Sequence, residues 1–225
     1  MIYAVGDVHG RLDKLERLLE RLPLRPEDRF VFLGDYVDRG PDPRGVVDRL
    51  LRLAAERPCV FLMGNHESMF LHYLGWKGPA YFGADVFLAN GGAETLISYD
   101  YFEREPPRPQ AFRLPPEHEV FYEALRMHHV EGDYLFVHAG LGRALVRGGD
   151  LGFALRRARP EELLWDRSTI DLPHDLGVTV VYGHTPRADF QVRWNPPWSI
   201  GIDTGAVYGG PLTAIRLPDE VIFQV

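Results

Sequence analysis

The sequence predicts an α/β fold in which parallel strands alternate with helices over the first third of the chain. Short apolar segments at residues 2–5, 30–33 and 60–63 each end in a loop rich in Gly, Asp, Asn or His. Each loop is followed by apolar residues at the spacing of an amphipathic helix. Three consecutive strand–loop–helix units imply parallel strands joined by helical crossovers.

Each unit has its own apolar pattern. The strand Ile2–Val5 precedes a helix marked by leucines at positions 12, 15, 18, 19 and 22. The strand Phe30–Leu33 precedes a polar loop and a helix with apolar residues at 46, 47, 50, 51 and 53. The strand Val60–Met63 is followed by a Gly/Asn/His loop and a helix through Met69–Leu74.

The middle of the chain, from about Gly75 to Pro116, has no clear period. It contains Gly78-Pro79, the pair Gly91-Gly92 and a proline-rich stretch at Pro106–Pro109, all of which interrupt regular elements. We interpret residues 75–116 as an insert of helices and loops that overhangs the site, within a single domain spanning residues 1–225.

Five strands are predicted after the insert. They are Tyr134–Val137, Val178–Tyr182, Ser199–Ile202, Leu212–Leu217 and Val221–Val225. The C-terminal part shows little helical spacing and several turns, which favours antiparallel pairing there.

Composition excludes several classes of protein. The net charge of −7 over 225 residues argues against a general nucleic-acid or membrane-surface binder, because such proteins normally present a basic face. Cys59 is the only cysteine, which rules out an internal disulfide, a thiolate zinc cluster and a CxxC redox pair. No apolar run approaches the ~20 residues of a membrane span, and the N-terminus lacks the basic region of a signal peptide. We therefore expect a soluble cytoplasmic protein.

Candidate functional residues, most of them possible metal ligands, follow the predicted strands in loops that a parallel sheet gathers at one edge. They are Asp7 and His9, then Asp35, Asp38 and Arg39, then Asn65, His66 and Glu67, and finally His138 and His184. Oxygen and imidazole ligands suit Mn, Fe or Zn better than copper or bare magnesium.

Each of these residues alone has a simpler explanation. Gly, Asn and Asp are ordinary turn residues, and a single histidine is commonly structural. Turn chemistry gives no reason, however, for a histidine after a strand at positions 9, 66, 138 and 184 alike. We therefore interpret the set as a metal centre, and expect His72, His118, His128, His129 and His174 to be structural or exposed.

These loops resemble the signature blocks of the phosphoprotein phosphatase family of metallophosphoesterases. GDVHG at residues 6–10, GDYVDRG at 34–40 and GNHE at 64–67 match in order and spacing. VHAG at 137–140, LLWDR at 163–167, GHTP at 183–186 and IDTG at 202–205 are similar to later blocks of the bacterial and phage branch. The resemblance implies the calcineurin-like fold, with two packed mixed β-sheets flanked by helices in α-β-β-α layers.

The resemblance also implies two divalent metal ions per chain. Asp7 and His9 would bind one ion and Asp35 would bridge both, while Asn65, His138 and His184 would complete the second site. A hydroxide between the ions would attack phosphorus directly, without a covalent phosphoenzyme. Mn is the expected metal, with Fe, Zn, Ni and Co as alternatives.

The catalytic and substrate-binding roles are implied in the same way. His66 would protonate the leaving oxygen, and Asp38 would orient and charge its ring. Arg39 and Arg167, together with Asn65, would hold the phosphate oxygens, since a guanidinium offers a planar fork that keeps its charge. Glu67 is expected to be a structural carboxylate.

Two activities compete for this site. One is a Ser/Thr protein phosphatase that could also accept phosphotyrosine and small aryl phosphates; the other is the symmetrical hydrolase of diadenosine tetraphosphate. The dinucleotide hydrolases typically read VARG and GNHD where this chain has VDRG, with Asp38, and then Glu67. The sequence therefore predicts a protein phosphatase, with the dinucleotide hydrolase as the alternative.

A third hypothesis is an inactive module that binds phosphorylated partners. It is disfavoured because such a module should have lost a ligand or the proton donor, and the chain retains them all. Regulatory subunits are not implied, and the physiological substrate, the native metal, the oligomeric state and the role of the insert remain open from the sequence.

Overall fold

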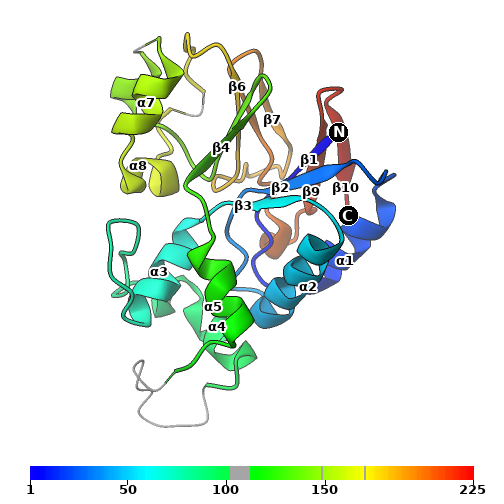
Figure 1. Cartoon of the computed structure of the whole chain (residues 1–225), viewed down its shortest axis with the longest axis vertical. Coiled ribbons are helices and arrows are strands. Elements are labelled where there is room, and N and C mark those ends of the chain that lie inside the picture. The colour runs from blue at the N-terminus through cyan, green and yellow to red at the C-terminus, as the bar shows by residue number, and fades with distance from the viewer. Residues whose placement is uncertain (102–111, 148, 170) are drawn as a thin grey trace.

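Two five-stranded mixed sheets form the centre of the molecule (Figure 1). The computed structural model describes residues 1–101, 112–147, 149–169 and 171–225. The first sheet has the order β10-β9-β1-β2-β3 and the second the order β4-β5-β6-β8-β7. The strands of the first sheet are β1 (Ile2–Val5), β2 (Arg29–Phe32), β3 (Cys59–Phe61), β9 (Thr213–Leu217) and β10 (Val221–Gln224). Those of the second are β4 (His128–Glu131), β5 (Tyr134–Val137), β6 (Thr179–Tyr182), β7 (Arg193–Asn195) and β8 (Ser199–Gly201).

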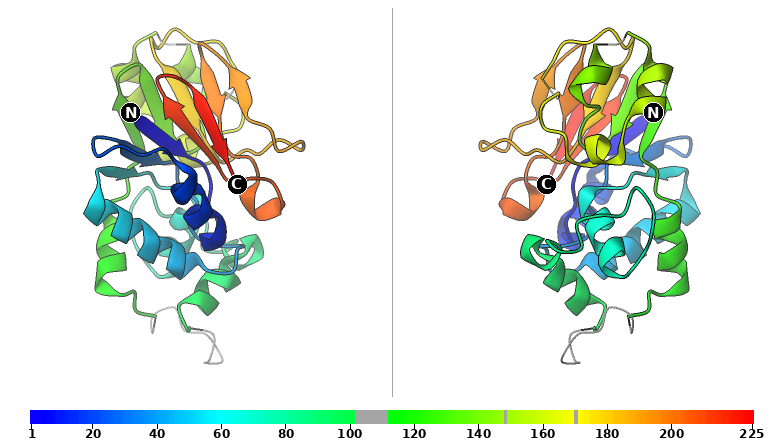
Figure 2. Two further views of the ribbon diagram at one scale, coloured as in Figure 1. Left: turned by 90° about the vertical axis from the view of Figure 1, so that its right-hand side faces the viewer. Right: turned by 90° about the vertical axis from the view of Figure 1, so that its left-hand side faces the viewer.

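The sheets pack face to face and carry helices on their outer faces (Figure 2). Successive side chains of a strand point to opposite faces, so each strand contributes to two apolar layers. The layer between the sheets includes Ala4, Val31, Ile215, Phe136, Val181 and Ile200, all buried. Helices α1 (Leu12–Arg21) and α2 (Pro43–Glu56) cover the first sheet, and α6 (Arg143–Val146), α7 (Leu151–Arg157) and α8 (Pro160–Trp165) lie beside the second. The predicted α-β-β-α layers are confirmed.

Local sequence explains where the first helices lie. The leucines of α1 recur on one side of the helix, and Leu15, Leu18 and Leu19 are buried against the first sheet. Helix α2 begins at Pro43, and the Asp42 side chain accepts a hydrogen bond from the backbone N–H of Gly45. Proline at the first helical position and aspartate before it are favourable, because they leave few backbone N–H groups unsatisfied.

The third strand–helix unit, which begins with β3, differs from the prediction because no loop separates the GNHE block from the helix. Helix α3 (Asn65–Tyr73) begins directly at Asn65, so the GNHE block is the first turn of a helix rather than a loop before one. The Glu67 carboxylate makes this possible, because it accepts a hydrogen bond from the backbone N–H of Gly64 at the start of the helix.

The C-terminal half differs in its strand directions. Strands β9 and β10 are antiparallel as predicted, but β8 runs parallel to β6, which in turn runs parallel to β5. The expectation of antiparallel pairing was therefore only half right for Ser199–Gly201, which pairs antiparallel with β7 but parallel with β6. Strands β4 and β7 and helices α5 (Pro116–Glu123), α6, α7 and α8 were not predicted, since they are short and lack a clear apolar period.

The described part of the insert comprises the 3-10 helix η1 (Leu88–Asn90), helix α4 (Gly92–Ser98) and the loops around them. Aromatic rings dock it on α3: Phe70 contacts Phe87, Tyr99 and Phe112 at centroid distances of 5.6, 6.1 and 5.9 Å. The proline-rich stretch Pro106–Pro109 lies outside the described residues. Within the described ranges, no helix has the length and apolar character needed to cross a membrane.

Candidate metal centre and active site

The predicted site residues gather at one edge of the two sheets, where five strands end. Asp7 and His9 follow β1, Asp35 to Arg39 follow β2, and Asn65 and His66 follow β3. His138 and His184 follow β5 and β6 of the other sheet. Because both sheets contribute, the site spans the seam between them.

Backbone strain is concentrated in these loops. Of the eight non-glycine residues with positive φ in the described ranges, five are predicted site residues: His9, Asp35, Asp38, Arg39 and His184. Such conformations cost on the order of 1–3 kcal/mol each and persist only where surrounding contacts hold them. The loops are therefore held in conformations that their residue types do not favour.

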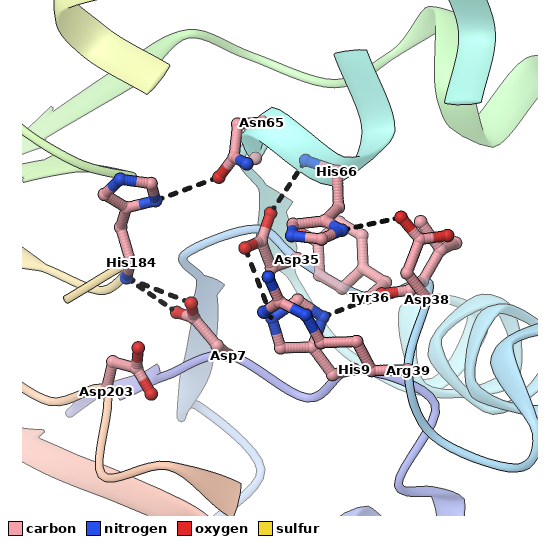
Figure 3. Close-up of polar contacts among 12 residues, drawn as sticks. Asp7, His9, Asp35, Tyr36, Asp38, Arg39, Asn65, His66, His184 and Asp203 are labelled. Carbon is pink, nitrogen blue, oxygen red and sulfur yellow. Dashed lines mark hydrogen bonds and ion pairs between the residues drawn. The ribbon is translucent and has the colours of Figure 1, made fainter. Parts of the chain in front are cut away.

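Asp35 lies at the middle of the cluster. Its Oδ2 is 3.4 Å from Nε2 of His9, and its Oδ1 is 3.4 Å from Nε2 of His138 (Figure 3 draws the His9 contact). Potential ligand atoms of Asp35, His138 and His184 lie within 4.8 Å of one another, as do those of His9, Asp35 and His66. Asp35 is the member that both groups share, which is the position a bridging carboxylate requires.

Asn65 completes the group on the second sheet's side. Its side-chain oxygen lies 3.0 Å from Nε2 of His138 and 2.9 Å from Nδ1 of His184. Gly64 before it leaves no room for a side chain, because a Cβ there would lie 2.1 Å from Oδ1 of Asp35.

Asp7 lies beside these groups rather than inside them. Its carboxylate accepts hydrogen bonds of 3.1 and 3.0 Å from the backbone N–H of His184, which ties β1 to the loop after β6. Burial and the neighbouring carboxylates of Asp203 and Asp35 raise the pKa of Asp7 well above its usual value.

Asp203 was not predicted as a site residue, although it lies in the IDTG block. It follows β8. Because β8 runs parallel to β6, Asp203 lies at the same edge as the other site residues, where it lines a pocket together with Asp35, His66 and His184. Burial raises the pKa of Asp203 to about 6. The IDTG block was the one feature of the sequence that could have identified Asp203, since the local strand pattern did not reveal the direction of β8.

Two of the histidines are oriented by backbone carbonyls. Nδ1 of His9 donates to the oxygen of Val37 at 2.8 Å, and Nδ1 of His138 donates to the oxygen of Leu33 at 2.8 Å. In each case the other ring nitrogen, Nε2, is left to present a lone pair toward Asp35. Burial lowers the pKa of both imidazoles, which favours the neutral form that metal ligation needs.

His66 has a different environment. Its Nδ1 donates to Oδ2 of Asp38 at 2.6 Å, and both side chains are almost fully buried (Figure 3). Burial would lower the pKa of His66, but the charges of Asp35 and Asp38 outweigh it, so the net shift is upward. Among His9, His66, His138 and His184, His66 is the one whose pKa is raised rather than lowered by its surroundings. It is also within ligand distance of Asp35, and geometry alone leaves both roles available.

Glu67 has a structural position that the sequence did not reveal in detail. Its Oε2 accepts from the backbone N–H groups of Asp35 and Gly64, each at 2.9 Å, and its Oε1 accepts from those of Tyr36 and Val37 at 2.8 and 3.2 Å. Glu67 therefore fastens the loop that carries Asp35 to the start of α3.

The two predicted phosphate-binding arginines line a pocket of about 300 Å³ together with Asp35, Asn65, His66 and His184. Nη1 of Arg39 donates to Nε2 of His9 at 2.7 Å, and Nε of Arg167 donates to Nε2 of His184 at 3.2 Å. The rings of Trp165 and Tyr208 line the same pocket. Tyr208 is 53% exposed, and Arg39 lies 5.4 Å from its ring centroid.

The donor set fits divalent cations. Burial by itself would raise the pKa of Asp35, but interaction with the surrounding imidazoles, His138 and His66 first, reverses the effect, so the net shift of its pKa is downward. Buried carboxylates, an amide oxygen and neutral imidazoles are hard or borderline ligands, and a cation would supply the positive charge they lack.

Comparison with known proteins agrees with the geometry. The model of a protein family described as "Calcineurin-like phosphoesterase" matches residues 1–211 of the 225 residues. The chain belongs to the calcineurin-like phosphoesterase family. This confirms the predicted resemblance and fold, and it implies divalent metal ions; the identity of the metal is a separate question.

Curated relatives carry a more specific name. The chain is 26% identical, over 97% of its length and 91% of the relative's, to "Bis(5'-nucleosyl)-tetraphosphatase PrpE [asymmetrical]" of Anoxybacillus flavithermus. It is 28% identical to the protein of the same name from Bacillus cereus, over 98% of this chain and 92% of that one. The solved structure of "a putative diadenosine tetraphosphatase" superposes with a TM-score of 0.68 at 24% identity, covering 100% of this chain and 92% of the other.

The residues that would hold the ions of this metallophosphoesterase are Asp7, His9, Asp35, Asn65, His138 and His184. Bound divalent ions would lower the pKa of a water molecule toward neutrality and stabilise the charge on a reacting phosphate. The chain itself supplies the His66 imidazole, held by Asp38, and two guanidinium groups at the pocket.

Proposed function

We propose that this metallophosphoesterase hydrolyses dinucleoside tetraphosphates asymmetrically, releasing a nucleoside triphosphate and a nucleoside monophosphate. The observation that carries the proposal is the composition of the pocket, which places two arginines and two aromatic rings around the cluster of histidines and carboxylates. The names of the curated relatives support the same class of substrate. The comparisons thus favour a dinucleoside tetraphosphatase, which was the alternative to the protein phosphatase predicted from the sequence. The symmetrical type was expected from the sequence, whereas these relatives are named asymmetrical.

Each part of the pocket matches a part of the substrate. Arg39 and Arg167 would neutralise and orient phosphate oxygens by charge-assisted hydrogen bonds. To do so, Arg39 would exchange its hydrogen bond with His9 for one with phosphate. The flat faces of Trp165 and Tyr208 suit a nucleobase, since stacking on aromatic side chains binds any base.

The closeness of an aromatic ring to the cluster supports asymmetric cleavage. The ring centroids of Trp165 and His184 lie 6.0 Å apart, and both residues line the pocket of about 300 Å³. A base held by Tyr208 or Trp165 would bring the phosphate nearest its own nucleoside to the cluster. Attack of water on that phosphate breaks the bond to the adjacent bridging oxygen and releases the monophosphate.

His66 would give its Nε2 proton to the leaving oxygen, and Asp38 would keep the ring turned and charged through the bond to Nδ1.

We further propose that residues 1–225 act as one domain, because the cluster takes residues from both sheets. Mn is the proposed native metal, on the ground that the donor set contains oxygen and nitrogen without thiolate.

A Ser/Thr protein phosphatase remains the second candidate, and the His66–Asp38 pair is the observation that favours it. An alkoxide of serine leaves poorly unless it is protonated, whereas a nucleoside polyphosphate leaves more easily. A buried, oriented acid is therefore more necessary for a phosphoprotein than for a dinucleotide.

The two candidates are separated by specificity constants measured with the Mn-loaded protein. We expect kcat/KM for diadenosine tetraphosphate to exceed those for phosphoserine and phosphotyrosine peptides by about tenfold or more, which corresponds to about 1.4 kcal/mol of additional transition-state binding. A preference for the phosphoserine peptide would overturn the proposal and establish the second candidate.

A further inference from the structure

The insert contacts the loop after β2 at the two residues that the proposed mechanism needs most. Helix α4 and the residues just before it lie against Asp38 and Arg39, which carry φ angles of 70° and 69°. Two consecutive non-glycine residues in the left-handed region need external contacts to hold them. The insert supplies such contacts.

Thr95 of α4 makes two hydrogen bonds to Asp38. Its hydroxyl accepts from the backbone N–H of Asp38 at 2.9 Å and donates to Oδ1 of the Asp38 carboxylate at 2.5 Å. The other carboxylate oxygen, Oδ2, accepts from Nδ1 of His66 at 2.6 Å. Thr95, Asp38 and His66 thus form one chain of hydrogen bonds in which all three residues are almost fully buried.

Arg39 is held by the residue at the start of the same helix. Its backbone N–H donates to the carbonyl of Gly91 at 3.0 Å. Gly91 itself has φ of 92°, and a Cβ there would lie 2.7 Å from Cγ of Arg39, so only glycine allows this approach. Asn90, one residue earlier, lines the active-site pocket.

We infer that the insert is a positioning element for the catalytic loop, and that Thr95 is the positioning residue that sets the Asp38 carboxylate against His66. One hydroxyl can fix both the backbone and the carboxylate of Asp38, because it accepts from the first and donates to the second. With both oxygens of the carboxylate engaged, the His66 ring has a single favourable orientation. The inference rests on the proposed role of His66 as the proton donor.

The kinetic test compares phenyl phosphate with p-nitrophenyl phosphate, which have similar size but unequal need for a proton on the leaving oxygen. Thr95→Val keeps the shape of the side chain and removes the hydroxyl. We expect it to lower kcat on phenyl phosphate by about tenfold, a fraction of the ~10²–10⁴ of a general acid, and to change kcat on p-nitrophenyl phosphate much less. Thr95→Ser, which restores the hydroxyl, should recover most of the loss.

Ser98→Ala is the matched control. Ser98 lies on the same helix, and its hydroxyl accepts from the backbone N–H of Arg44 and donates to the carbonyl of Thr95, away from Asp38. It should leave the ratio of the two substrates unchanged. If Thr95→Val slows both substrates equally, or if Ser98→Ala reproduces its effect, Thr95 merely stabilises the helix and the inference is overturned.

A spectroscopic measurement tests the inference even if His66 is not the acid. The Nδ1 proton of His66, which faces Asp38, is followed by NMR and assigned by its loss in His66→Asn. Thr95→Val should shift this resonance and speed its exchange with water, while Ser98→Ala should not. An unchanged resonance in Thr95→Val would contradict the positioning role, whereas equal slowing of both substrates by His66→Asn would contradict only the role proposed for His66.

Discussion

At the scale of single residues, the histidines of the cluster differ in the hydrogen-bond acceptor of their Nδ1 atoms. His9 and His138 donate Nδ1 to backbone carbonyls, while His66 donates to the carboxylate of Asp38. A carbonyl orients a neutral ring, whereas a carboxylate also favours its protonated form. His66 therefore differs from His9 and His138 in the way that the proposed proton donor requires.

Replacing His66 tests this distinction. His66→Asn should slow hydrolysis of phenyl phosphate by the ~10²–10⁴-fold expected on losing a positioned acid, and slow p-nitrophenyl phosphate considerably less. Metal content should stay unchanged, because the ring is held by Asp38 and is not needed for the ions. Loss of an ion together with equal slowing of both substrates would show instead that His66 is a ligand, as its distance from Asp35 permits.

Tyr208 gives a second prediction at this scale. If its ring stacks on a base, Tyr208→Ala should raise KM for diadenosine tetraphosphate by about tenfold, because stacking of one base on an aromatic side chain is worth about 1–3 kcal/mol. Tyr208→Phe keeps the ring and should behave like the unaltered protein. Arg39 lies over the same ring, so hydrolysis of p-nitrophenyl phosphate is the control that shows whether Tyr208→Ala has displaced Arg39. An unchanged KM for the dinucleotide in Tyr208→Ala would refute the stacking role.

At the scale of elements, one carboxylate joins the second and third strand–helix units. Glu67 accepts four backbone hydrogen bonds, from Asp35, Tyr36, Val37 and Gly64, and is fully buried. The bonds fix both the β2 loop and the first turn of α3. The GNHE block therefore connects two units of the fold, in addition to carrying the proposed ligand Asn65.

The substitution Glu67→Gln should destabilise the fold. The new amide NH₂ would face two backbone N–H groups, and each unsatisfied buried donor costs about 1–3 kcal/mol. We expect the free energy of unfolding to fall by about 2–4 kcal/mol, and Tm to fall by about 2–4 °C for each kcal/mol. Glu131→Gln is the control: it breaks the surface ion pair with Arg29 and should cost less than about 1 kcal/mol. Equal Tm values for the two variants would contradict the structural role of Glu67.

The elements that could be predicted from sequence are those with a repeated apolar period. The three strand–helix units at the start were found because leucines and valines on one face of a helix leave a regular pattern. Strand β8 is only Ser199–Gly201, and three residues carry no information about the direction of pairing. That limit is why Asp203 was missed, although the loops after β1, β2 and β3 were recognised.

At the scale of the whole molecule, the site depends on the seam between two sheets. The first sheet provides His9, Asp35 and Asn65, and the second provides His138 and His184. That the two sheets would meet at this site could be predicted only from the family resemblance, because apolar periodicity does not show how two sheets pack together. Thr95 shows the same limit, since its contact with Asp38 joins residues 57 positions apart.

The central claim is that the pocket binds a nucleoside beside the cluster and cleaves the phosphate nearest to it. The most direct measurement is the identity of the products formed from diadenosine tetraphosphate by the Mn-loaded protein, separated by ion-exchange chromatography at early times. Asymmetric cleavage predicts ATP and AMP in equal amounts. Two molecules of ADP for each substrate, or no cleavage of the dinucleotide under conditions in which p-nitrophenyl phosphate is hydrolysed, would contradict it.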